Sequence, residues 1–178
     1  VKQARWHLAR AMPAEEELTK AISALDQALA RDSTLALAYS NRGDARLVRA
    51  QIRLAAGGDA EADFAAAEQD LGRAVEVGAP DIRAWQLLGD VRLQWANFRL
   101  QRGLDPQDLV ARAITAYDRA LEFYPNSPFA RYGRGQARGT DAYQRFRARQ
   151  DPSEPAQGAR ADFDALIPGP LAAQSLVF

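Results

Sequence analysis

The stretch AITAYDRALEFYPNS, residues 113–127, decides the fold, because it occurs in related form twice upstream at a constant step. It aligns without a gap on AEQDLGRAVEVGAPD, residues 67–81, and on AISALDQALARDSTL, residues 21–35, so the step is 46 residues each time. Self-similarity at a fixed period is the signature of an array of structural repeats. The chain is therefore predicted to consist of copies of one unit.

The same step holds for small, basic and acidic side chains outside this stretch. The positions that follow it are Ala38, Ala84 and Ala130; Gly43, Gly89 and Gly135; Arg46, Arg92 and Arg138; Arg53, Arg99 and Arg145; and Asp59, Asp105 and Asp151. No gap is needed over three copies, so coincidence does not explain the pattern.

Each copy is predicted to contain two helices. In residues 36–56, small and apolar residues recur at spacings of three and four from Tyr39 through Gly43 to Leu54, which is one face of an α-helix. A break at residues 57–59 separates this helix from a second one over 60–76, because Gly ends helices and Asp caps them. The corresponding breaks are residues 103–106 and 150–152.

These boundaries predict one repeat domain over residues 1–167, followed by a tail, 168–178. The repeat units are 36–81, 82–127 and 128–167, with a partial leading unit, 1–35. In the leading unit we expect two helical pieces, 1–11 and 14–31, separated at Met12-Pro13. Glu15, Glu16 and Glu17 would then lie at a helix start, where carboxylates interact favourably with the positive end of the helix dipole.

The second helix and exit turn of the third copy resemble a tetratricopeptide repeat. First helices of that family carry an aromatic residue and, four residues later, a Gly that lets two helices approach closely. Tyr39 with Gly43 and Trp85 with Gly89 fit this pattern, and the third copy keeps only the Gly, Gly135. A family repeat has about 34 residues, and HEAT-type repeats of about 40–47 residues are the alternative. The resemblance implies an all-α fold, an α-solenoid of antiparallel helix pairs with about three and a half repeats in a right-handed superhelix.

Composition argues against several classes of function. Basic and acidic residues balance at 23 each, whereas nucleic-acid binders normally carry a basic excess, so we expect no nucleic-acid partner. No window approaches the roughly 18 uninterrupted apolar residues of a membrane span, so we expect no membrane insertion. The sequence has no Cys, a single His (His7), and no phosphate loop or catalytic triad. We therefore expect a protein that is not an enzyme and that has no metal or cofactor.

The resemblance also implies a peptide-binding groove on the first helices. In the family's register the groove is lined by Leu37, Ser40, Asn41, Asp44, Leu47, Arg83, Gln86, Asp90, Leu93, Phe129, Tyr132 and Gln136. Asp44 and Asp90 stand where family members that clamp a C-terminal carboxylate use Asn or Arg. We therefore expect a protein or peptide partner that is basic or amide-rich. Alternatively, both aspartates are solvated or pair with arginines such as Arg83 or Arg131.

An arginine stripe recurs on the first helices. It comprises Arg42, Arg46, Arg49 and Arg53 in the first copy, Arg92 and Arg99 in the second, and Arg134, Arg138 and Arg145 in the third. We expect these arginines to face the second helices, which carry Asp26, Asp63, Glu68, Asp70, Asp118 and Asp162. The alternative is a ladder that holds phosphate or an acidic partner.

The expected function is a non-catalytic protein–protein interaction module. The alternative is a structural spacer or oligomerisation arm of a larger protein. The apolar tail segment, residues 171–178, is expected either to cover the last helix pair or to dock on another copy and give self-association. The chain opens with Val1 and without a signal pattern, which indicates an excised domain or a processed chain and favours a cytoplasmic location.

Overall fold

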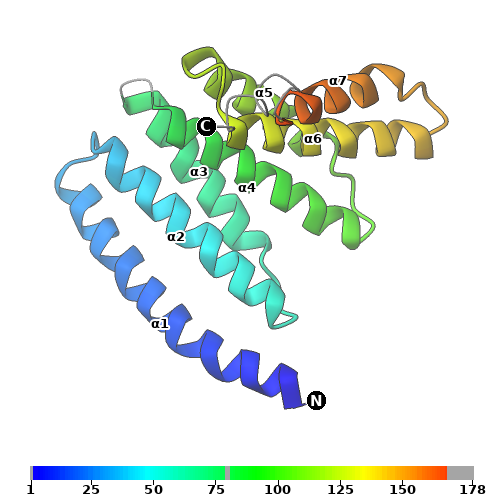
Figure 1. Cartoon of the computed structure of the whole chain (residues 1–178). Coiled ribbons are helices and arrows are strands. Elements are labelled where there is room, and N and C mark those ends of the chain that lie inside the picture. The colour runs from blue at the N-terminus through cyan, green and yellow to red at the C-terminus, as the bar shows by residue number, and fades with distance from the viewer. Residues whose placement is uncertain (1, 79–80, 168–178) are drawn as a thin grey trace, which may run out of the picture. The chain divides into compact units, whose positions relative to one another are not determined.

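The computed structural model describes residues 2–78 and 81–167, with the side chains of residues 15–78 and 81–167. Within these residues the chain is all-α and forms seven helices (Figure 1). They are α1 (Lys2–Arg31), α2 (Ala36–Ala55), α3 (Glu61–Val77), α4 (Ile82–Gln101), α5 (Gln107–Phe123), α6 (Pro128–Arg147) and α7 (Ser153–Asp164). The predicted alternation of first helices (α2, α4, α6) with second helices (α1, α3, α5, α7) is confirmed.

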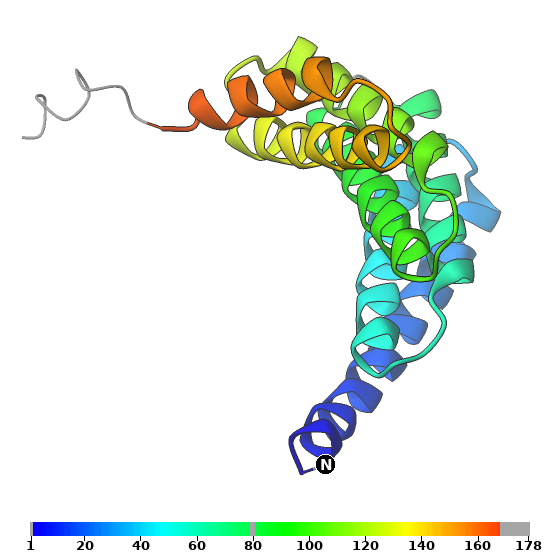
Figure 2. The ribbon, with the colours of Figure 1, turned by 90° about the vertical axis from the view of Figure 1, so that its right-hand side faces the viewer.

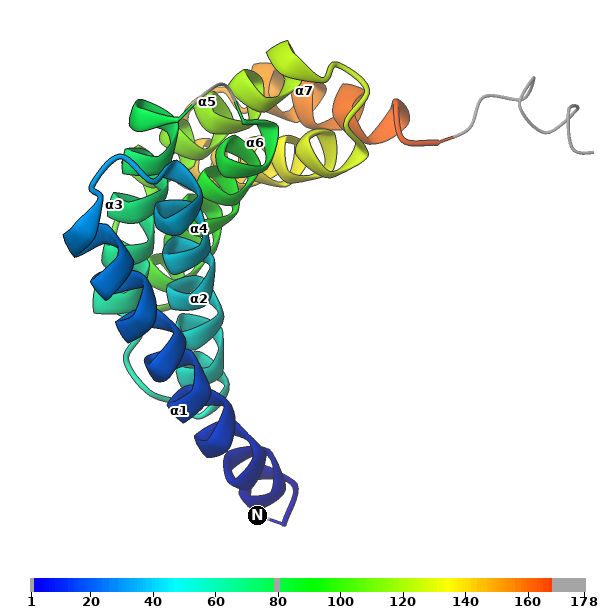
Figure 3. The same ribbon diagram turned by 90° about the vertical axis from the view of Figure 1, so that its left-hand side faces the viewer.

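The helices pack in chain order within two compact units, residues 1–91 and 92–178, whose boundary falls inside α4. In the first unit α1 packs on α2 and α2 packs on α3. In the second unit α5 packs on α6 and α6 packs on α7. Within each unit the helices that pack together run antiparallel, as Figure 2 shows for α6 and α7 and Figure 3 shows for α1 and α2.

Glycines let the paired helices approach closely in both units. A Cβ atom at Gly43 would lie 2.6 Å from Cγ of Leu71, and one at Gly135 would lie 2.8 Å from Cε1 of Phe163. These separations are below ordinary van der Waals contact, so a larger residue would push the second helix away. Both the glycines and their partners are 92 residues apart, which is two repeat steps. The predicted close approach within a helix pair is confirmed.

The same turn ends the first helix in every copy. Gly57 and Gly103 have φ values of 77° and 72°, and Arg149, at the third equivalent position, has a φ of 58°. In all three copies the next residue's amide donates to the carbonyl five positions earlier, with N···O distances of 2.8–2.9 Å. This hydrogen bond, together with the left-handed residue, forms a Schellman cap that satisfies helix-terminal carbonyls.

An aspartate then leads into each second helix, as the sequence predicts. Asp59, Asp105 and Asp151 each accept a hydrogen bond from the backbone amide two residues later, at N···O distances of 2.9–3.0 Å. Hydrogen bonds from Ser153 lower the pKa of Asp151 below its ordinary value, so this carboxylate stays ionised where it caps. The break between the two helices of each copy is therefore encoded locally, three times.

The leading segment differs from its prediction, because α1 continues through Met12-Pro13 as one helix of 30 residues. A proline removes a single backbone donor, and a helix with enough other hydrogen bonds continues past it. Glu15 consequently lies inside the helix, so the helix-dipole interpretation of the three glutamates is wrong. Glu15 instead accepts a hydrogen bond from Nε of Arg53 at 2.8 Å. Glu16 and Glu17 pair with Lys20 on their own helix.

We predict that Arg149→Gly stabilises the protein, because Arg149 holds a left-handed conformation that Gly adopts without strain. A left-handed conformation costs a side-chain-bearing residue roughly 1–2 kcal/mol, and the greater flexibility of unfolded Gly offsets part of the gain, so we expect a net stabilisation of about 0.5–1 kcal/mol. Urea unfolding followed by circular dichroism measures this change.

Two variants control for the lost charge and for the conformation. Arg149→Ala removes the same charge without relieving the strain and should leave stability unchanged or lower. Gly57→Ala introduces the strain in the first copy and should destabilise by about 1 kcal/mol. Equal stabilisation by Arg149→Gly and Arg149→Ala would assign the effect to the charge and contradict the conformational explanation.

Candidate functional site

One guanidinium joins three helices in the first unit. Arg42 on α2 donates from Nε and Nη2 to both carboxylate oxygens of Asp70 on α3, at 2.9 and 2.5 Å, and from Nη1 to Asp26 on α1 at 2.6 Å. Arg46 also reaches Asp70, at 2.6 Å. Asp70 is only 2% exposed, so its charge needs these partners. Hydrogen bonding to Asp70 raises the pKa of Arg42.

The second unit repeats this arrangement at residue numbers larger by 92. Arg134 on α6 donates to both oxygens of buried Asp162 on α7 and, at 2.7 Å, to Asp118 on α5. Arg138 contacts the same Asp162 at 3.0 Å. The hydrogen bond to Asp162 raises the pKa of Arg134, as its counterpart does for Arg42. The same three-helix arrangement therefore occurs twice, two repeat steps apart.

The remaining arginines of the stripe also bond within the protein. Arg49 and Arg53 both pair with buried Asp63, at 2.5 and 2.8 Å. Arg92 donates to a main-chain carbonyl on α5 at 3.0 Å, as Arg46 and Arg138 do at the equivalent positions on α3 and α7. The prediction that the stripe faces the second helices is confirmed for seven of its nine arginines: Arg42, Arg46, Arg49, Arg53, Arg92, Arg134 and Arg138.

The twelve predicted groove residues divide into three groups by exposure. Leu37, Asn41, Arg83, Phe129, Tyr132 and Gln136 are exposed, Asp44, Gln86 and Asp90 are half-buried, and Ser40, Leu47 and Leu93 are buried. The last group is a correction, because buried side chains cannot line a binding surface. Leu47 lies four residues after Gly43, on the core stripe of α2, and Leu93 is its equivalent on α4.

Ser40 is buried for a different reason, which is the start of α4. It lines a cavity of about 200 Å³ together with residues of α2, α3 and the first turn of α4, among them Ala74 and Ala84. Ser40 therefore faces the next first helix of the array and not the solvent. The resemblance to the family predicts that Ser40 lies on the groove face of α2, but it lies on the adjacent face.

On α2, three of the predicted residues share one side of the helix. Leu37, Asn41 and Asp44 follow spacings of four and three, and the Leu37 side chain is 67% exposed. Arg83 on α4 donates to Asp44 at 3.2 Å, which confirms the predicted alternative that this aspartate pairs with an arginine. The surface is therefore apolar and amide-bearing at Leu37 and Asn41, with the charge of Asp44 partly compensated.

On α6, an exposed aromatic stripe extends beyond the residues that the sequence nominated. Phe129 is 79% exposed and Tyr132 is 52% exposed, and the Tyr132 hydroxyl accepts a hydrogen bond from Nε2 of Gln136 at 3.1 Å. Tyr143 and Phe146 are also exposed and continue the stripe at helical spacing. Continuing the i, i+3, i+7 pattern past Gln136 would have found them.

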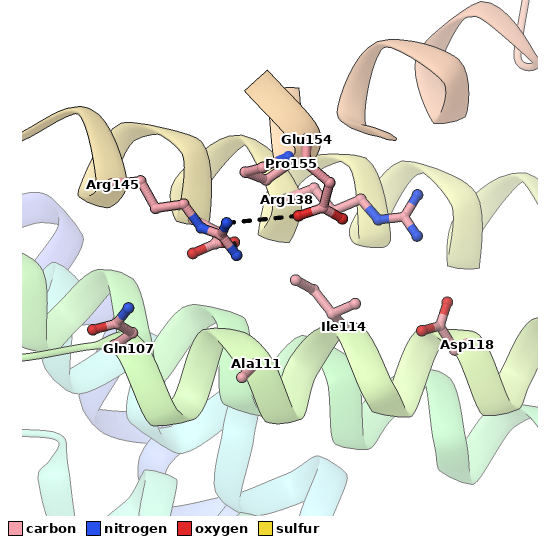
Figure 4. A pocket seen from close by; sticks show the side chains of 9 residues that line it. Gln107, Ala111, Ile114, Asp118, Arg138, Arg145, Glu154 and Pro155 are labelled. Atoms are coloured by element: carbon pink, nitrogen blue, oxygen red, sulfur yellow. Dashed lines mark ion pairs between the residues drawn. The ribbon is translucent and has the colours of Figure 1, made fainter. Parts of the chain in front are cut away.

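A second surface feature, which the sequence did not indicate, is a cavity of about 440 Å³ between α5, α6 and α7 (Figure 4). Its apolar floor includes Ala111, Ile114 and Pro155. The charged residues that line it have partners in the protein: Asp118 with Arg134, Arg138 with Asp162, and Arg145 with both Asp141 and Glu154. The cavity therefore combines an apolar floor with side chains that are ion-paired within the second unit.

Within the described residues, no cluster of three or more His, Cys, Asp or Glu side chains is placed to hold a metal ion. None of the helices described combines the length and the apolar character needed to cross a bilayer. The tail segment 171–178 and the side chain of His7 lie outside the part that the structure describes. Comparison of the chain with known protein families and with curated proteins found no match.

We predict that Arg42→Leu destabilises the first unit and that adding Asp70→Ala restores most of the loss. The single change leaves Asp70 buried with Arg46 as its remaining partner, which should cost about 2–3 kcal/mol. The double change copies the middle repeat, where the equivalent residues are Leu88 and Ala116. Urea unfolding of the wild type, the two single variants and the double variant completes the cycle. Losses that simply add would contradict a direct coupling between the two residues.

Proposed function

We propose that this chain is a non-catalytic protein–protein interaction module that binds peptide or protein segments on the exposed face of its first helices. The observation that carries the proposal is the exposure of large apolar side chains at equivalent positions. Leu37 is 67% exposed and Phe129, two repeat steps later, is 79% exposed. Exposed apolar groups clustered beside polar ones are typical of interaction surfaces.

The proposed fold is a tetratricopeptide-like α-solenoid with long, 46-residue repeats, in which antiparallel helix pairs stack into a right-handed superhelix. Its support is the close approach at Gly43 and Gly135, the repeated turn at 57, 103 and 149, and the residues that resemble the family. A HEAT-like array is the alternative fold, since its period is also about 40–47 residues. Both arrays use stacked helix pairs to present an extended binding surface.

The chemistry of the exposed faces defines the proposed partner. Phe129, Tyr132 and Gln136 on α6 offer aromatic rings and an amide, and Leu37 and Asn41 on α2 offer an aliphatic side chain and an amide. We therefore propose a partner segment with apolar side chains next to amide or basic groups. The arginines that would attract nucleic acid are hydrogen-bonded to carboxylates within each unit, which argues against such a partner.

The alternative is a structural spacer or oligomerisation arm of a larger protein. Its support is that salt bridges tie three successive helices to one another within each unit. A spacer needs no exposed binding residues, so the two functions differ in what Phe129 contributes. The binding experiment below separates them.

We predict that the purified chain enriches peptides from a phage-displayed random library. Phe129→Glu should weaken the binding of these peptides at least tenfold, measured as an increase in Kd. A buried aromatic anchor commonly contributes 1.4 kcal/mol or more, which is about a factor of ten in Kd. Leu37→Glu tests the first unit in the same way. Isothermal titration calorimetry with the enriched peptides measures the change.

The matched control is Phe123→Glu, which places the same charge on an exposed aromatic at the end of α5, outside the first helices. It should change Kd by less than about twofold. Absence of any enriched peptide, or equal weakening by Phe123→Glu and Phe129→Glu, would reject the proposed surface and favour the spacer.

A further inference from the structure

We propose that residues 171–178 dock on the open face of α6 and α7, with Leu176 over Tyr132, as the first turn of α4 docks on α2 and α3 in the first unit. The proposal concerns one part of the proposed binding face: the chain's own tail covers Tyr132, and Phe129 stays open to a partner. The arrangement of α4 in the first unit serves as the model for what covers the exposed apolar residues of α6 and α7.

The open face is formed by the start of α6 and the end of α7. Tyr132 and Phe163 are both exposed, and their rings make an edge contact at a centroid distance of 6.0 Å. Ile167, shortly after α7, is also exposed. Because α6 and α7 are antiparallel, the chain leaves α7 beside the first turns of α6. Three large apolar side chains thus meet the solvent where the described chain ends.

The first unit shows what covers the equivalent face. There the first turn of α4 rests on α2 and α3, where Ser40, Ala74 and Ala84 are all buried and line one small cavity. Adding two repeat steps to these numbers gives Tyr132, Leu166 and Leu176. Tyr132 is 52% exposed and Ser40 is 4% exposed. In the first unit the first turn of α4 lies beside Ser40 and lines the same cavity.

The sequence places an apolar segment at the matching position. Residues 171–178, LAAQSLVF, carry no charge and begin four residues after Ile167. At the repeat step of 46, Leu176 aligns with Ala38, Ala84 and Ala130, all of which are buried. One residue departs from the pattern: Ala173 stands where Asp81 and Ser127 accept capping hydrogen bonds. Docking is therefore driven by apolar contact and not by a helix cap.

The first unit also indicates which residue of α6 stays exposed when the segment docks. Leu37 remains 67% exposed although the first turn of α4 contacts the same end of α2. Its equivalent on α6 is Phe129. The segment therefore covers Tyr132 and leaves Phe129 free, so two neighbouring aromatics on one helix are expected to behave differently. This contrast makes the inference testable independently of the proposed binding function.

The experiment uses the absence of Cys from the sequence. Single variants Tyr132→Cys and Phe129→Cys are prepared in the full chain and in a chain that ends at Pro170, and the rate of each thiol with Ellman's reagent is measured. Deleting the segment should accelerate the thiol at 132 by at least about fivefold and change the thiol at 129 by less than about twofold, since only the first position is protected by docking. Leu176→Asp in the full chain should reproduce the acceleration.

A second measurement identifies the occupant. Oxidation of Tyr132→Cys/Leu176→Cys should give a disulfide within one chain, whereas Tyr143→Cys/Leu176→Cys should not, because Tyr143 lies eleven residues, about 16 Å, along the helix. Equal thiol rates with and without the segment would overturn the proposal. Disulfides found only between chains, with protection that disappears on dilution, would replace it by docking of a second copy. Circular dichroism melts confirm that each variant is folded.

Discussion

The structure depends on a guanidinium that holds three successive helices by charged hydrogen bonds. Arg42 binds a buried carboxylate on the helix that follows it and an exposed one on the helix that precedes it. A buried ion pair stabilises little compared with an apolar pair, yet losing one partner is costly. Because the bonds are directional, they fix how far the helices slide along one another. The cores themselves are rich in Ala, which packs well at many offsets.

The glycines set the distance between the axes of paired helices, and the arginines set how far one helix is shifted along the other. Leu71 and Phe163 fill the space left by a missing Cβ at Gly43 and Gly135, so the helix axes come close enough for a guanidinium to span both. The middle repeat has the uncharged residue Leu88 where its neighbours have Arg42 and Arg134. Apolar packing is therefore sufficient there, and the ion pairs recur at every second step.

Most of the fold could be predicted from the sequence because the turns are local. Gly57, Gly103 and the aspartates that follow fix where helices end, whatever the tertiary structure. The helices that carry the acid partners could be predicted from the alternation of first and second helices, although Asp70 and Asp162 are two repeat steps apart and Ala116 stands between them. The continuity of α1 through Pro13 could not, because a proline lowers helix stability without always ending the helix. The exposure of individual side chains also could not be predicted from the sequence, because the burial of Ser40 depends on which helix lies beside it.

Some equivalent positions are buried in every copy of the repeat, and others change in residue type and exposure from copy to copy. The Ala38, Ala84 and Ala130 series is buried throughout and unchanged in residue type. The series that starts at Ser40 changes from a small buried hydroxyl to the exposed ring of Tyr132, because its neighbour changes. The charges of most of the arginine stripe are bound inside each unit. The first helices therefore expose aromatic and amide groups beside charges that are already paired, and the proposed recognition rests on these groups.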